Sequence, residues 1–303
     1  MKKNEKRAWA LVLSGGGAKG LAHLGILKAF ADRGFPEPSL VVGTSMGAIV
    51  GGLYACGISP GELIRFVQEE FDITAYLDSF VFKLNGPVGK FFQTGQILGN
   101  FTTRQGVDSG QGILKLLEAL TQGKTFAETT IPFRCNAVDL VSGKELVLRS
   151  GSVARALRAS MSFPAFFEPL LVEEEGVSQC LVDGGLADNM PVRIARDEGF
   201  KRVLAVNVCD FKPVPVSTLR TGPQIVYRAI EVALQVMGRK QESLADLTLY
   251  TADQVSPFNF FRKKELIELG ELVVKEQEPQ IQAFFSGMRK WTAGTNKGSL
   301  FSV

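Results

Sequence analysis

Short runs of apolar residues alternate along the chain with longer segments in which apolar residues recur at helical spacing. Residues 9–13 and 39–42 form two of these runs, and the segments that follow them, 21–33 and 46–56, have helical character. Strands that alternate with helices in this way form a parallel sheet with right-handed crossovers. The pattern therefore predicts a strand–helix–strand–helix unit at the start of the chain.

The alternation continues and favours one α/β domain over residues 8–303, after a basic tail at residues 1–7. Further strands are predicted at 132–140, 144–149, 179–182, 203–208 and 250–255, and further helices at 61–71, 112–120, 152–160, 222–246 and 263–285. We find no internal repeat or convincing linker, so a C-terminal helical region at 222–290 is expected to join the same domain. The apolar run after the tail is too short for a signal peptide, and we interpret it as the first strand.

Residues 71–103 interrupt this pattern. The segment is rich in phenylalanine and contains Gly86, Pro87, Gly89 and Gly95, which disfavour regular structure. Two interpretations stay open: the rings pack over an edge of the sheet, or the segment forms an apolar wall or lid beside an active site.

A second unusual stretch, from Pro38 to Gly61, contains no charged residue and is long enough to span a bilayer. Its many glycines, including Gly51 and Gly52, argue against a membrane span. We interpret it as a strand, a turn and a buried helix.

Composition narrows the classes of function. The formal net charge of +3 is too small to indicate nucleic-acid binding. The four cysteines form no Cys-x-x-Cys pair, which is typical of reduced thiols in a cytoplasmic protein. With one histidine and scattered cysteines, we expect no metal site.

A glycine-rich loop, Ser-Gly-Gly-Gly-Ala-Lys-Gly at residues 14–20, follows the first predicted strand. Its spacing fits the G-x-G-x-x-G pattern of dinucleotide-binding loops. However, the second strand leads to Gly43 instead of an acidic residue for a ribose, and Lys19 is out of register for a P-loop. Backbone N–H groups of such a loop can stabilise an oxyanion. The alternative is a tight turn without a ligand.

The second candidate segment is Gly43-Thr44-Ser45-Met46-Gly47. The pattern G-x-S-x-G places a serine nucleophile on a tight strand-to-helix turn, and the alternative is a serine that only caps a helix. In the α/β-hydrolase order the histidine base follows the serine, but the one histidine, His23, precedes it. His23 lies on an apolar predicted helix, and we expect it to be packed in the core.

The candidate base is Asp183, which ends the apolar run 179–182 and is followed by two glycines. Functional groups of open parallel sheets gather at the carboxyl ends of strands, so we expect Asp183 on the same rim as Ser45. Burial would raise the pKa of this carboxyl and make it a better base at neutral pH. The alternative is an aspartate that caps a turn.

These three segments, in this order, resemble the motifs of the patatin-like phospholipase family. Residues 14–20 resemble its glycine-rich oxyanion loop, residues 43–47 its nucleophile elbow and residues 183–185 its Asp-Gly-Gly motif. His23 falls where bacterial members often have a histidine, and Ser160, Pro164, Asn189 and Pro191 resemble further family positions. The resemblance extends over residues 8–210 and implies a three-layer α/β/α fold with a mainly parallel central sheet.

The resemblance also implies a Ser–Asp dyad, with Ser45 as nucleophile and Asp183 as proton acceptor, and no metal or organic cofactor. The oxyanion hole would use the N–H groups of Gly15, Gly16, Gly17 and Met46, and the motifs would be shaped by Lys19, Gly20, Gly43, Gly47, Gly184 and Gly185.

The function implied is that of a lipid acyl hydrolase, a phospholipase A or lysophospholipase-like esterase that forms an acyl-enzyme. Two alternatives stay open: an acyltransferase that uses the same dyad, and a non-catalytic regulatory protein with the same fold.

The expected partner is a lipid or acyl-ester substrate, and the sequence leaves the oligomeric state open. Phe258, Phe260 and Phe261 precede Arg262, Lys263 and Lys264, a pairing suited to an anionic lipid surface. The alternative is a buried aromatic cluster before a helix. The expected location is cytoplasmic, with peripheral contact at the inner membrane face under the first interpretation.

Overall fold

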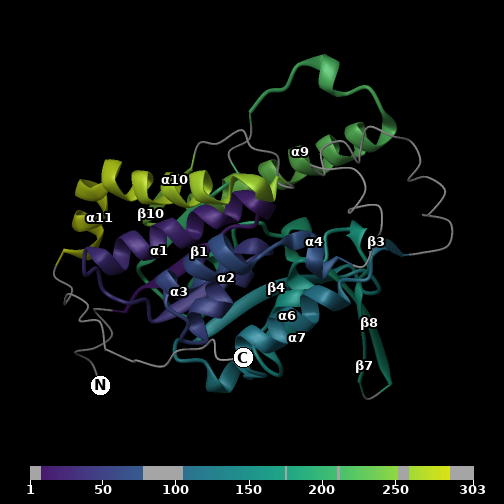
Figure 1. Ribbon diagram of the computed structural model, residues 1–303, viewed down its shortest axis with the longest axis horizontal. Helices are drawn as coiled ribbons and strands as arrows, with labels where there is room; N and C mark the ends of the chain where they lie inside the picture. The colour runs from purple at the N-terminus through teal and green to yellow at the C-terminus, as the bar shows by residue number, and fades with distance from the viewer. Residues whose placement is uncertain (1–7, 78–104, 175, 210–211, 252–258, 287–303) are drawn as a thin grey trace.

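The computed structural model describes residues 8–77, 105–174, 176–209, 212–251 and 259–286 (Figure 1). The predicted basic tail at 1–7, most of the aromatic-rich segment at 71–103 and Phe258 lie outside these residues.

A mainly parallel sheet of eight strands forms the centre of the described structure. Its order is β10 (Leu247–Tyr250), β9 (Val203–Asn207), β1 (Ala10–Leu13), β2 (Leu40–Gly43), β4 (Phe133–Asp139), β8 (Val177–Asp183) and β7 (Leu170–Glu174), and β5 (Lys144–Leu148) also pairs with β4. The pairs from β10 to β4 are parallel, while β5, β8 and β7 are attached antiparallel. The predicted parallel α/β architecture is confirmed.

Two strand ends meet on one edge of β4. β5 pairs with β4 from Cys135 to Asp139, whereas β2 pairs with β4 only up to Cys135 and β8 only from Ala137 onward. Because a residue in a sheet has one neighbour on each side, β2 and β8 must share the edge opposite β5. The carboxyl end of β2 at Gly43 therefore faces the carboxyl end of β8 at Asp183.

Helices cover both faces of the sheet, as the three-layer prediction requires. On one face lie α1 (Ala22–Asp32), α2 (Met46–Ala55), α6 (Gln111–Thr121), α7 (Val153–Ser160), α10 (Lys263–Glu276) and α11 (Glu278–Phe285), and on the other lies α8 (Val192–Asp197). In β1, the side chain of Leu11 packs with α1 and α10 on one face, and that of Val12 packs with α8 on the other face. Both faces of the strands are apolar because both are covered.

The remaining elements connect or flank these layers. They are the short helices η2 (Gly17–Leu21), α3 (Pro60–Arg65), η3 (Phe66–Glu70), α4 (Ile73–Tyr76), η6 (Phe126–Glu128), η7 (Gly184–Leu186), η8 (Val216–Thr218) and η9 (Phe260–Arg262), the long helix α9 (Gly222–Glu242), and the paired strands β3 (Gly106–Asp108) and β6 (Ala165–Phe167). Helix α9 contacts α8 and η7.

Several sequence predictions need correction. The last edge strand, β10, starts at Leu247 and ends at Tyr250, earlier than the predicted range 250–255, and residues 252–255 lie outside the described residues. β7 and α8 were not predicted at all. Nor did the sequence indicate that Arg158 of α7 is buried, where it donates to the carbonyls of Ser109, Gly110 and Glu168.

The uncharged stretch between Pro38 and Gly61 forms β2 and α2, both largely buried, as predicted. Within the described ranges, no helix combines the length and hydrophobicity needed to cross a membrane.

The C-terminal helix α10 packs directly on α1, and Figure 1 shows the two helices lying along one another. Two glycines make this approach possible. A Cβ atom on Gly25 would overlap the carbonyl oxygen of Ile267, and one on Gly270 would overlap the carbonyl oxygen of Ala22. The region after residue 210 is thus tied to the first helix of the chain by backbone contact.

We expect Gly25→Ala to lower the free energy of unfolding by about 3 kcal/mol, because the methyl group meets backbone that must shift. The measurement is equilibrium unfolding in denaturant. Gly61→Ala is the matched control: Gly61 is also helical, has nothing near its Cβ position, and its replacement should be neutral or slightly stabilising. Equal midpoints for the two variants would contradict this account of the α1–α10 contact.

Candidate active site

Ser45 lies on a strained turn between β2 and α2. Its backbone has φ 53° and ψ −122°, a region that a serine rarely adopts. The glycines on both sides are required by space, since a Cβ on Gly43 would lie 2.5 Å from the Gly47 carbonyl oxygen and one on Gly47 would overlap the Leu13 carbonyl. The turn leaves Ser45 partly exposed at the end of a buried strand.

Asp183 ends β8 and is only 3% exposed. Its carboxylate accepts a hydrogen bond from the N–H of Gly185 at 2.8 Å and lies close enough to the Ser45 hydroxyl to interact with it. Burial raises the pKa of Asp183 to about 6, although both interactions oppose the rise. The site therefore pairs a hydroxyl with a carboxyl poised to exchange a proton near neutral pH.

The two residues meet for a different reason than the sequence suggested. The prediction treated Asp183 as the end of another parallel strand, but β8 is antiparallel to β4. Ser45 and Asp183 come together because β2 and β8 end against each other on one edge of β4.

The glycine-rich loop approaches Ser45 from β1. The N–H of Gly15 donates to the Asn189 carbonyl at 3.1 Å, so the assignment of this N–H to an oxyanion hole is corrected. Within the described residues, the N–H groups of Gly16, Gly17 and Met46 have no hydrogen-bond partner. Gly16 and Gly17 are also partly exposed. These three N–H groups are available to a ligand oxygen.

Close contacts lock the loop and the elbow together. A Cβ on Gly20 would overlap the Met46 side chain, so η2 and the start of α2 touch. On the other side, a Cβ on Gly185 would lie 2.9 Å from the side-chain oxygen of Asn189. Lys19 lies in η2 and is partly buried.

His23 is packed in the core, as predicted. It is fully buried, and its Nε2 donates to the Ser14 carbonyl at 2.9 Å, while its Nδ1 has no partner among the described residues. Burial lowers the pKa of His23 to about 4, so the ring is neutral at pH 7. The histidine supports the start of the glycine-rich loop.

Three side chains near Ser45 were not recognised as a set from the sequence. The hydroxyl of Ser160 accepts the Ser45 N–H at 3.0 Å, and the Thr44 hydroxyl donates to Asn136 at 2.8 Å. Asn136 is fully buried in β4. The one sequence signal was an asparagine in the middle of a predicted strand, between cysteine and alanine, where a buried amide requires hydrogen-bond partners.

The expectation of no metal site was based on the single histidine and the scattered cysteines. The described part of the chain holds no group of three or more such residues placed to bind an ion.

Comparisons with known proteins relate the chain to enzymes of lipid metabolism. Human patatin-like phospholipase domain-containing protein 6 is 32% identical over 210 residues, which cover 69% of this chain and 14% of that protein. Lysophospholipase NTE1 of Mycosarcoma maydis is 35% identical over 198 residues, covering 65% of this chain and 9% of that protein. This chain thus spans only a small part of these curated relatives.

Among solved structures, human GIVD cytosolic phospholipase A2 aligns with a TM-score of 0.49 at 10% identity, over 94% of this chain and 60% of that one.

The family model for patatin-like phospholipases matches residues 11–196. This match covers more than half of the chain and includes the glycine-rich loop, the elbow and Asp183. The predicted patatin-like fold and lipid-hydrolase family are therefore confirmed, and the chain belongs to the patatin-like phospholipase family.

Proposed function

We propose that this protein is a serine lipid acyl hydrolase of the phospholipase A or lysophospholipase type, working through Ser45 and Asp183. One observation carries the proposal: the Ser45 hydroxyl, on a strained and partly exposed turn, lies beside the buried carboxylate of Asp183 and interacts with it. Membership of the family and the lysophospholipase name of a relative support a lipid ester as the substrate.

In the first step, Ser45 attacks the ester carbonyl while Asp183 takes the hydroxyl proton. Burial has raised the pKa of Asp183 to about 6, which makes it a stronger base than an exposed aspartate and lowers the cost of this proton transfer. The alcohol part of the lipid leaves with that proton, and the acyl group stays on Ser45.

The negative charge that forms on the carbonyl oxygen needs donors fixed in advance. The unpartnered N–H groups of Gly16, Gly17 and Met46 fit this role, and the positive end of the α2 dipole adds to it. In the second step Asp183 takes a proton from water, the hydroxide attacks the acyl-enzyme, and Ser45 recovers its proton.

The two alternatives differ from this proposal in ways that can be observed. An acyltransferase would form the same acyl-enzyme but deliver the acyl group to an acceptor other than water, which product analysis with added acceptors detects. A non-catalytic regulatory protein would not react at Ser45, so a fluorophosphonate probe would fail to label it.

We expect Ser45→Ala and Asp183→Asn each to lower kcat/KM on a short-chain aryl ester by about a thousandfold or more. The matched surface controls are Ser39→Ala and Asp32→Asn, which should keep wild-type activity. Purified variants that retain most of the activity would contradict the proposal.

Loss of folding can be separated from loss of chemistry in the Asp183→Asn variant. Because the pKa of Asp183 is raised in the folded protein, ionisation of this carboxyl destabilises the fold. The destabilisation begins as the pH rises above the pKa of the aspartate in the unfolded chain, and it is complete above about pH 6. The neutral amide removes this cost, so the inactive variant should unfold at a temperature no lower than wild type at pH 7.

We expect the activity to be lost in acid with a midpoint near pH 6. Asp183 must be ionised to accept a proton, so kcat/KM should be constant above this pH and fall about tenfold for each unit below it. The measurement is a pH profile with an ester whose own ionisation does not change. A midpoint at pH 4, the range of an exposed aspartate, would show that Asp183 is not the base in this environment.

Contact with an anionic lipid surface is a separate part of the proposal. Lys263 contacts the carbonyl and ring of Phe71, and Arg262 pairs with Glu265, so these two cations are engaged within the protein. Phe261, in contrast, is 69% exposed. Phe260, which is also described, packs against the core, so Phe261 is the residue of this pair that suits insertion into a membrane interface.

We therefore expect Phe261→Ser to weaken co-sedimentation with vesicles that contain phosphatidylserine. Val177→Ser, at a similarly exposed apolar residue beside the β7–β8 turn, is the matched control and should leave binding unchanged. Equal binding of both variants and wild type would rule out this contact.

A further inference from the structure

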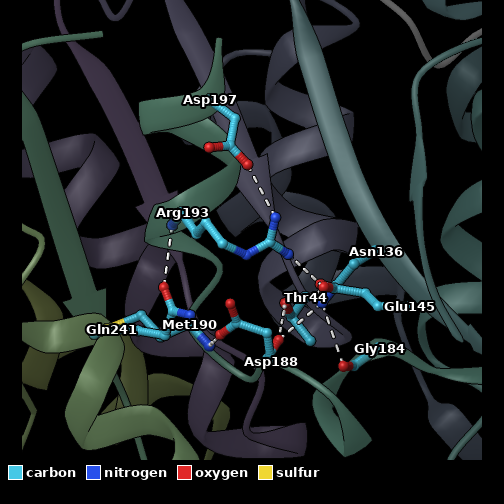
Figure 2. Close-up of polar contacts among 9 residues, drawn as sticks. All are labelled: Thr44, Asn136, Glu145, Gly184, Asp188, Met190, Arg193, Asp197 and Gln241. Atoms are coloured by element: carbon cyan, nitrogen blue, oxygen red, sulfur yellow. Dashed lines mark hydrogen bonds and ion pairs between the residues drawn. The ribbon is translucent and has the colours of Figure 1, made fainter. Parts of the chain in front are cut away.

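A buried asparagine lies where the two strand ends meet. Asn136 belongs to β4, has no exposed surface, and stands between Cys135, which faces β2, and Ala137, which faces β8. Figure 2 shows its side chain surrounded by polar groups from several segments. Burying an amide in a central strand costs free energy unless its hydrogen bonds are made, so the partners of Asn136 indicate what this residue does.

The Asn136 amide joins the segments that carry Ser45 and Asp183. Its Oδ1 accepts a hydrogen bond from the Thr44 hydroxyl at 2.8 Å, and Thr44 directly precedes Ser45. Its Nδ2 donates to the carbonyl of Gly184 at 3.2 Å, directly after Asp183.

The carbonyl of Asp188 completes this junction. It accepts from Asn136 Nδ2 at 2.8 Å and, at 3.1 Å from the Thr44 hydroxyl, shares the single hydrogen of that hydroxyl with Asn136 Oδ1, so these three groups form a closed ring. The next residue, Asn189, holds the glycine-rich loop through its bond to Gly15. These hydrogen bonds, together with the peptide bond from Asp188 to Asn189, therefore connect the three family motifs.

The orientation of the Asn136 amide is fixed from the opposite side. Glu145 of β5 accepts from Nδ2 at 3.0 Å, and its other oxygen pairs with Arg193 of α8. Arg193 is in turn bonded to Asp197 at 2.9 Å, and its N–H donates to Gln241 (Figure 2). Because Glu145 and the two carbonyls can only accept, a flipped amide would set oxygen against oxygen.

We propose that Asn136 is a positioning residue for the reaction: through Thr44 and Gly184 it sets the Ser45 hydroxyl against the Asp183 carboxylate. This inference rests on the proposed function of these two residues. The positioning matters because Ser45 is held in a strained conformation at the end of one strand and Asp183 at the end of another. A displacement of about 1 Å between reacting groups can cost a hundredfold in rate.

The test uses two substitutions that break the ring in different places. Thr44→Val keeps the shape of the side chain and removes the hydroxyl, and Asn136→Asp keeps the shape and replaces a donor with an acceptor. Thr44→Ser keeps the hydroxyl and is the rescue variant. Thr121→Val is the matched control, because Thr121 is also buried and its hydroxyl bonds the Leu117 carbonyl at 2.8 Å in α6.

We expect Thr44→Val and Asn136→Asp to lower kcat on a short-chain aryl ester by about tenfold to a hundredfold with little change in KM. Thr44→Ser should recover most of the loss. Thr121→Val should lower the unfolding temperature but not kcat. If Asn136→Asp does not fold, Thr44→Val with its rescue variant decides the question.

The pH profile adds a readout that a general loss of stability would not move. The interaction with Ser45 lowers the pKa of Asp183, so weakening this interaction should shift the acidic midpoint of kcat/KM to higher pH. The other titratable and charged groups near this site are unchanged in Thr44→Val. Cys209 interacts electrostatically with Asp183, and Asp188 interacts with Glu145 and Arg193. The Thr121→Val profile should coincide with wild type.

A crystal structure of Thr44→Val keeps this inference distinct from the proposed function. We expect the distance between Ser45 Oγ and the Asp183 carboxylate to be longer in the variant than in a crystal structure of the wild type. An unchanged Ser45–Asp183 distance, or a kcat and acidic midpoint equal to those of Thr121→Val, would overturn the inference. Full activity of Ser45→Ala would instead overturn the proposed function, whatever the structure of Thr44→Val shows.

Discussion

Two strands that end against each other on one edge of β4 create the constraint on which the site depends. β2 arrives parallel to β4 and β8 antiparallel to it, so both carboxyl ends point to the same place. This arrangement brings a hydroxyl from one chain segment to a carboxylate from another and buries the carboxylate. The raised pKa of Asp183 follows from that burial, and the proposed chemistry follows from the pKa.

The remainder of the fold holds this meeting point in place. Glycines at positions 43, 47, 184 and 185 allow backbone and side chains to approach more closely than a Cβ would permit. The segment from Asp188 to Asn189 connects the elbow to the glycine-rich loop, and neutral His23 supports that loop from the core. The stability cost of a buried carboxyl and a strained serine is a common feature of functional sites.

Much of this could be predicted from the sequence because its signals are local. The apolar runs and helical spacing located β1, β2 and α2, and the glycines around Ser45 and Asp183 marked turns with special geometry. The strand β7 was missed because its sequence, Leu-Leu-Val-Glu-Glu, has no alternation, and it is held mainly by pairing with β8. Likewise, Gly15 fits the oxyanion pattern in sequence, but its N–H is occupied by Asn189, far along the chain. Asn136 was missed for the same reason, since its partners come from three other segments.

The central claim is that the Ser45 hydroxyl becomes acylated when Asp183 accepts its proton. Rapid-quench mass spectrometry of the protein mixed with an activated ester measures this step directly. The account predicts an acyl group on the peptide that contains Ser45, formed at a rate that falls below about pH 6 and is nearly abolished in Asp183→Asn. Turnover without an acyl group on Ser45, or rapid acylation of Ser45 in Asp183→Asn, would contradict it.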